Sequence, residues 1–82
     1  MILNALIKSH RIKMGISQRR LSKLLGYPNA VFVNNIEKNR AKMPRAKLKR
    51  LSRALLLDRQ SIYMAAMADE ARELRKDLGL SE

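Results

Sequence analysis

The stretch GISQRRLSKLLGYPNAVFVNNIEK, residues 15–38, decides the fold of this chain of 82 residues. Two short segments within it, residues 17–25 and 30–38, have the apolar spacing of helices and are separated by a turn that begins at Gly26. Ser17 is a favoured residue at a helix N-terminus, and glycine readily takes the left-handed conformation that ends a helix. The stretch therefore predicts two short helices joined by a sharp reversal.

Three further helices are expected on either side of this stretch. Residues 3–14 place Leu3, Ile7 and Met14 on one stripe, which predicts a helix that ends at Gly15. Residues 44–56 predict a second helix, because proline is favoured in the first turn. Asp58 is a favoured capping residue for a last helix that reaches residue 78. With only three glycines and two prolines in the chain, we expect an all-α domain of five helices with an extended C-terminal helix.

Positive charge is concentrated in the first two thirds of the chain. The whole sequence has 18 Lys and Arg against 7 Asp and Glu, a net charge of +11. Residues 1–57 contain 14 of these bases and a single acid, Glu37, whereas residues 58–82 have a net charge of −2. A folded basic body of this kind indicates a polyanionic partner, and nucleic acid is the expected one.

Several functional classes are excluded by what the sequence lacks. It has no cysteine, which excludes disulfides, thiol nucleophiles and cysteine-ligated metals. His10 is the only histidine, and we expect it to be half-buried on a helix and to bind no metal. We find no glycine-rich phosphate loop and no catalytic grouping, so we expect no enzyme activity, no metal and no cofactor. No signal peptide or membrane span is visible, which predicts a cytoplasmic, nucleoid-associated protein with no membrane partner.

Five groups of residues carry a resemblance to a known family. They are Gly15-Ile16-Ser17-Gln18, Leu21, Leu24-Leu25-Gly26, Ile36-Glu37-Lys38-Asn39 and Leu51-Ser52-Arg53-Ala54-Leu55. Over residues 3–62 this pattern resembles the Cro/repressor (XRE-type) helix-turn-helix family of DNA-binding proteins. The chain departs from the common pattern in a span from Gly26 to Glu37 that is one residue longer, in Asn39 where glycine is usual, and in His10 at a frequently aliphatic position.

The resemblance implies that the helix of residues 30–38 enters the major groove of DNA. The residues that it matches to base-contacting positions are Ala30, Val31, Asn34 and Asn35. Those that it matches to phosphate-contacting positions, or that flank them, are Ser17, Gln18, Asn29, Lys38, Asn39, Arg40, Lys42 and Arg45. An asparagine amide pairs well with the N6 and N7 edge of adenine. The alternative is that Asn34 and Asn35 are simply exposed polar residues.

The lone acid of the basic body needs a partner. The resemblance pairs Glu37 with Arg11, and we interpret this ion pair as structural, since it would fix the pose of the reading helix against the first helix. The aromatic residues Tyr27, Phe32 and Tyr63 are too few and too separated for an RNA-stacking platform. We expect all three to lie in the core or at its edge.

A heptad-like stripe runs along the last helix. It consists of Met64, Met67, Ala71, Leu74 and Leu78, spaced 3, 4, 3 and 4 residues apart. This spacing predicts a dimer seam, although such a stripe can also pack on its own domain. We therefore divide the chain into a DNA-binding domain, residues 1–62, and a C-terminal extension for dimerisation, residues 63–82.

Together these features predict a sequence-specific regulator that binds double-stranded DNA as a repressor-like homodimer. Two alternatives stay open. An antitoxin-type protein would bind its own operator and neutralise a toxin-like partner protein, and an adjacent toxin-like reading frame would identify it. A sequence-tolerant binder of RNA or of the nucleoid would be identified by competition with unrelated duplex and with structured RNA.

Overall fold

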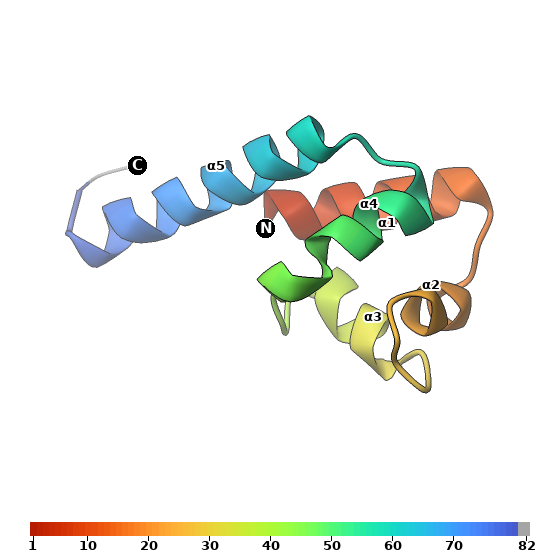
Figure 1. Ribbon diagram of the computed structural model, residues 1–82. Coiled ribbons are helices and arrows are strands. Elements are labelled where there is room, and N and C mark those ends of the chain that lie inside the picture. Colours follow the sequence, from red (N-terminus) through yellow and green to blue (C-terminus); the bar gives the residue numbers. More distant parts are fainter. Residues whose placement is uncertain (81–82) are drawn as a thin grey trace.

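Five α-helices and one short 3-10 helix form the regular structure in the computed structural model, which describes residues 1–80. Their bounds are α1 (Ile2–Met14), α2 (Gln18–Leu24), α3 (Val31–Glu37), η1 (Arg45–Lys47), α4 (Leu48–Leu55) and α5 (Arg59–Asp77). The prediction of an all-α chain is thus confirmed. The long helix α5 lies along α1, and its C-terminal part projects beyond the other helices (Figure 1).

Local capping signals set most of the helix ends where the sequence predicts them. The Ser17 hydroxyl accepts a hydrogen bond of 3.0 Å from the backbone N–H of Arg20. The Asp58 carboxylate likewise accepts a bond of 3.2 Å from the N–H of Ser61. Each bond satisfies a backbone donor that has no partner within the first helical turn. These contacts explain why α2 and α5 begin where they do.

The helix predicted over residues 44–56 begins later than expected but ends within one residue of the predicted end. Pro44 has extended backbone dihedrals (φ −62°, ψ 139°) and precedes the 3-10 turn η1, so that α4 begins only at Leu48. At the other end Leu56 takes a left-handed conformation (φ 49°), which a leucine adopts at a cost in strain. The Ser52 hydroxyl holds this reversal by donating a hydrogen bond of 2.6 Å to the carbonyl of Leu57. The reversal buries Leu57 in the core.

One apolar core lies between α1, α2, α3, α4 and the first half of α5. Its fully buried side chains, with no exposed surface, are Ile7, Leu21, Leu25, Val33, Ile36, Leu51 and Leu55. Met14 was expected on the core stripe of α1 but is 39% exposed. Met14 is the last residue of α1. It lies seven residues after Ile7, the last residue of this helix that is buried in the core.

Helix α5 joins the body of the domain well beyond residue 62. It crosses residues 62 and 63 without a break, and both Ile62 and Ala65 are buried. Further along, the Asp69 carboxylate accepts hydrogen bonds from the backbone N–H groups of Ile2 (2.7 Å) and Leu3 (3.0 Å). A carboxylate is favourable there because the N-terminal end of a helix carries partial positive charge. The first half of α5 therefore packs on the body formed by residues 1–62, whereas the sequence predicts residues 63–82 as a separate extension.

Candidate nucleic-acid interface

Helices α2 and α3 are held at a defined angle by contacts around their connecting turn. Gly26 has a φ of +93°, which favours glycine, and it begins the reversal after α2. The buried Ser22 hydroxyl accepts a hydrogen bond of 3.3 Å from the backbone N–H of Val33 in α3. Asn29 accepts one of 3.0 Å from the N–H of Val31, which orders the first turn of α3. The first bond connects α2 to α3 and the second orders the start of α3, so together they fix the orientation of α3 relative to α2.

The exposed face of α3 carries the residues that the resemblance implies for base contact. Positions 31, 34, 35 and 38 share one side of the helix, because residues three, four and seven apart lie on one face. Val33 and Ile36 are fully buried on the opposite side. Val31 is 61% exposed, whereas Asn34 and Asn35 are half-buried. The structure thus brings Val31, Asn34 and Asn35 together, with Ala30 at the start of the helix.

A chain of polar side chains links this face to the interior. Arg11 donates to both oxygens of Glu37, from Nε at 2.6 Å and from Nη2 at 3.0 Å, which confirms the predicted ion pair. The Gln18 amide donates to Glu37 at 3.0 Å. The Asn34 amide in turn donates to the Gln18 oxygen at 3.3 Å. The resemblance implies that Gln18 braces the reading helix, but it did not indicate Glu37 and Asn34 as the partners, because these contacts depend on the angle between α2 and α3.

The environment of Glu37 keeps its carboxylate ionised. Burial by itself would raise the pKa of Glu37, and only 3% of its side chain is exposed. The hydrogen bonds from Arg11 and Gln18, together with the charges of Arg11 and Lys8, outweigh burial and lower the pKa below its ordinary value. Because Arg11 also donates to the carbonyl of Ile16 at 2.9 Å, the pair ties α3 to the end of α1 and the start of α2.

The predicted phosphate contacts in and beside the loop after α3 form two groups, those without a side-chain partner in the described part of the chain and those that contact another side chain. Lys38 and Arg40 are exposed, and neither has an ion-pair partner in residues 1–80. Asn39 takes a left-handed conformation (φ 58°), and its side-chain oxygen accepts a hydrogen bond of 3.2 Å from the buried Asn4 amide. Lys42 is engaged elsewhere, because it forms an ion pair of 2.5 Å with Glu73 of α5.

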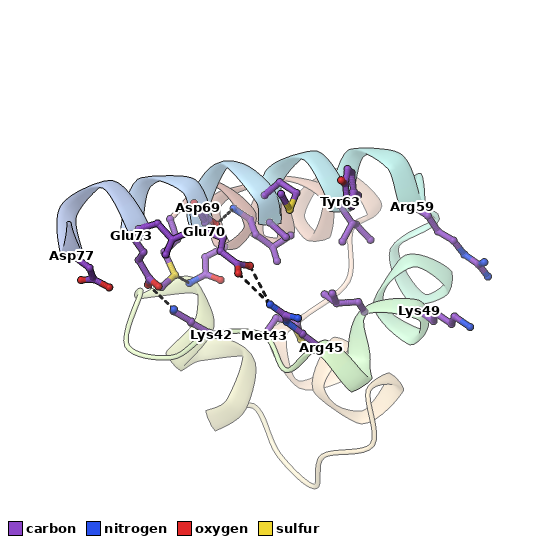
Figure 2. A pocket seen from close by; sticks show the side chains of 18 residues that line it. Lys42, Met43, Arg45, Lys49, Arg59, Tyr63, Asp69, Glu70, Glu73 and Asp77 are labelled. Carbon is purple, nitrogen blue, oxygen red and sulfur yellow. Dashed lines mark hydrogen bonds and ion pairs between the residues drawn. The ribbon is translucent and has the colours of Figure 1, made fainter. Parts of the chain in front are cut away.

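A groove separates α5 from the segment that contains Lys42 and η1 (Figure 2). Its volume is about 660 Å³, and its apolar lining includes Leu3, Met43, Leu48 and Ile62. Figure 2 shows the acidic residues of α5 on one side and the basic residues of the other segment opposite them. Arg45 spans the groove and pairs with Glu70 at 3.1 Å. Two of the predicted phosphate contacts, Lys42 and Arg45, are therefore held by carboxylates of α5.

The predicted dimer stripe lies on the outer side of α5. Four of its side chains are largely exposed: Met64 (62%), Met67 (47%), Leu74 (55%) and Leu78 (71%). Ala71 between them is exposed as well. Helix α5 contacts the core through Ile62 and Ala65, while Met67 and Leu74 of the stripe also line the groove, so the dimer seam stays a prediction.

The aromatic residues behave in two ways. Tyr27 and Phe32 stack with ring centroids 3.8 Å apart and pack at the edge of the core, as predicted. Tyr63 was expected there too but is 58% exposed, because it lies beside the groove, on the side of α5 that faces away from the core.

His10 is half-buried, as predicted. Within residues 1–80, no group of three or more His, Cys, Asp or Glu side chains is arranged to hold a metal ion.

Comparison of the chain with protein-family models, with curated proteins and with solved structures finds no match. The resemblance to the Cro/repressor family therefore stays a prediction that rests on the quoted residues. Among the helices of residues 1–80, none combines the length and the apolar character that crossing a bilayer requires.

Proposed function

We propose that this chain is a sequence-specific, double-stranded DNA-binding transcriptional regulator of the Cro/repressor type. In this proposal α2 and α3 form the helix-turn-helix, and α3 enters the major groove. The observation that carries it is the exposed face of α3, which the buried Arg11–Glu37 pair braces from behind. The charge of the body supports the same partner, since residues 1–57 have a net charge of +13 and their only acid lies in that pair.

The side chains on α3 suit the reading of base edges. Asn35 has no hydrogen-bond partner for its amide in residues 1–80, so its donor and acceptor are both available to adenine N7 and N6. Asn34 gives one N–H to Gln18 and keeps its oxygen and its second N–H for a base. Val31, with most of its side chain exposed, suits contact with a thymine methyl group.

The residues around this face are the candidates for contact with DNA phosphates. Lys38 and Arg40 are the first candidates, because their charges are not neutralised within residues 1–80. Lys42 and Arg45 would have to exchange the carboxylates of α5 for DNA phosphates. Such contacts position the protein and contribute salt-dependent affinity, but they carry no base sequence.

The exposed stripe of α5 supports a homodimer. Large apolar side chains with about half or more of their surface exposed, in a row on one helix, are typical of a contact with another protein. A twofold pair of such domains would present its two α3 helices to major grooves about one turn of DNA apart, ~34 Å. The expected binding site is therefore an inverted repeat.

Selection of bound duplexes from a random-sequence library tests the proposal. We expect an enriched consensus with twofold symmetry, and we expect Asn35→Ala to change the preference at one position of each half-site. A wild-type protein that binds duplex DNA but enriches no consensus would contradict sequence-specific reading and would favour a sequence-tolerant binder.

A further inference from the structure

A second cluster of cationic side chains lies beside the turn that ends α2, apart from the exposed face of α3. A Cβ atom added to Gly26 would lie 3.2 Å from Nη1 of Arg50 and 3.4 Å from Nζ of Lys47. Two cationic groups, one from α4 and one from η1, therefore converge on the backbone of a single glycine. Arg53, one helical turn after Arg50, lines the same hollow between α2 and α4.

This cluster has no counter-ion in residues 1–80. Glu37 is the only acid before residue 58, and its oxygens are bound by Arg11 and Gln18. The ion pairs made by acids of α5 involve Lys42 and Arg45. Like charges brought together repel each other, and an anion placed between them converts this repulsion into attraction. An anion bound beside Gly26 would therefore be attracted by both Lys47 and Arg50.

The surroundings hold the cationic groups in place. Nζ of Lys47 lies 5.2 Å from the ring centroid of Tyr27, within the range of a cation–π interaction, and Tyr27 is itself fixed by its stack on Phe32. Leu24 and Ala54 form the apolar part of the hollow between α2 and α4. The C-terminal end of α2 carries partial negative charge, which favours cations beside it.

We propose that Lys47, Arg50 and Arg53 bind the sugar-phosphate backbone of a nucleic acid, at a site separate from the exposed face of α3. Arg50 and Arg53 are three positions apart in α4, about 4.5 Å along the helix axis, and Lys47 precedes them at the end of η1. One strand of a duplex offers a phosphate every ~3.4 Å along its axis, so cations a few ångströms apart can contact neighbouring phosphates. Arginine in addition matches phosphate oxygens with two parallel hydrogen bonds.

This inference rests on the proposed function for the class of its ligand, but it does not depend on base reading by α3. The test therefore uses a duplex DNA of random sequence and compares the wild type with Arg50→Gln/Arg53→Gln. The control is Lys13→Gln/Arg72→Gln, which also removes two positive charges, but from exposed positions of α1 and α5. Circular dichroism melting is used to check that all three proteins are folded at the temperature of the assay.

Binding is measured over a series of salt concentrations. For the cluster variant we expect a log–log salt slope shallower by about 0.9 for each lost phosphate contact, and a loss of about five- to tenfold in affinity per contact near 0.1 M salt. The control should keep the slope of the wild type. In parallel, the backbone amide resonance of Gly26 should shift when duplex is added to the wild type and stay in place in the cluster variant.

The outcomes separate the two proposals. If the wild type binds duplex and both double variants lose the same amount, the cluster is a solvated basic surface and this inference is overturned, while DNA binding stands. If a poly-glutamate chain shifts the Gly26 resonance as the duplex does, the cluster takes an acidic peptide and the assignment to nucleic acid is overturned. If the wild type binds no duplex at all, the proposed function and this inference both fail.

Discussion

Removal of the Glu37 carboxylate should destabilise the whole domain. The side chains of Arg11 and Glu37 are only 14% and 3% exposed, and three hydrogen bonds converge on the carboxylate. Glu37→Ala would leave the Arg11 guanidinium and the Gln18 amide without this acceptor. Loss of one partner of a buried pair typically costs about 3–5 kcal/mol. Domains of this size have a stability of only about 5–15 kcal/mol, so the loss is a large fraction of the total.

Thermal and urea unfolding, followed by circular dichroism, measure this loss. At ~4–8 °C per kcal/mol for a domain of this length, Glu37→Ala should lower Tm by at least about 12 °C. The double variant Arg11→Met/Glu37→Leu is the matched control, because it replaces both charges by apolar groups and leaves no charge unpaired. It should lose much less than the single variant. A single variant within about 1 kcal/mol of the wild type would refute the argument that this pair holds α3 in place.

The same pair predicts a pH dependence with a definite sign. The folded-state pKa of Glu37 is lowered from its ordinary value of 4.5, so the ionised carboxylate stabilises the folded state. This contribution is complete above pH 4.5, and it is lost as the pH falls through the lower folded-state pKa. The stability gap between the wild type and the double variant should therefore be constant from pH 7 to about pH 5 and change only below about pH 4.5. A change centred near neutral pH would contradict the assignment.

Three further predictions concern DNA binding and assembly. Asn35→Ala should weaken binding to the selected site by about 1–3 kcal/mol and leave binding to random duplex unchanged, measured by fluorescence anisotropy; equal losses on both duplexes would contradict base reading. Glu70→Gln/Glu73→Gln should tighten binding to random duplex and steepen its salt slope, since it frees two cations; an unchanged slope would mean that these cations face away from DNA. Leu74→Glu should be a monomer in sedimentation, and its affinity for the full site should fall towards that for a half-site. The control Arg72→Glu should stay dimeric. A wild type that is monomeric even when bound to its site would contradict the proposed dimer.

Local signals in the sequence predict the helix ends because those signals act over a few residues. Ser17 and Asp58 cap the helices that follow them, and Gly15 takes the left-handed conformation expected after α1. Hydrophobic spacing identifies most of the core for the same reason. The Arg11–Glu37 pair spans 26 positions, and it was predicted only through the family resemblance and the absence of any other acid nearby.

Contacts that depend on the angle between helices could not be predicted in this way. The ion pairs Lys42–Glu73 and Arg45–Glu70 exist because α5 folds back along α1. Nothing in the spacing of either segment indicates that direction. The exposure of Tyr63 has the same origin, since the rotation of α5 about its own axis decides which of its residues face the core. Pro44 illustrates a competing local choice, because proline suits an extended residue before a helix as well as the first helical turn.

The placement of α5 also changes how the charge asymmetry of the chain is understood. Its acids do not lie apart from the basic body, because Asp69, Glu70 and Glu73 contact the start of α1, η1 and the loop before η1. They neutralise cations at the groove, while the cations at the α3 face and at the Gly26 turn have no such partner in residues 1–80. Helix α5 therefore neutralises Lys42 and Arg45, whereas exposed cations of α1 and of α5 itself, such as Lys13 and Arg72, have no ion-pair partner within residues 1–80. Figure 1 shows α5 and α3 on opposite sides of the molecule, so a contact between two copies through the exposed Met64, Met67, Leu74 and Leu78 of α5 would not bring their two α3 faces together.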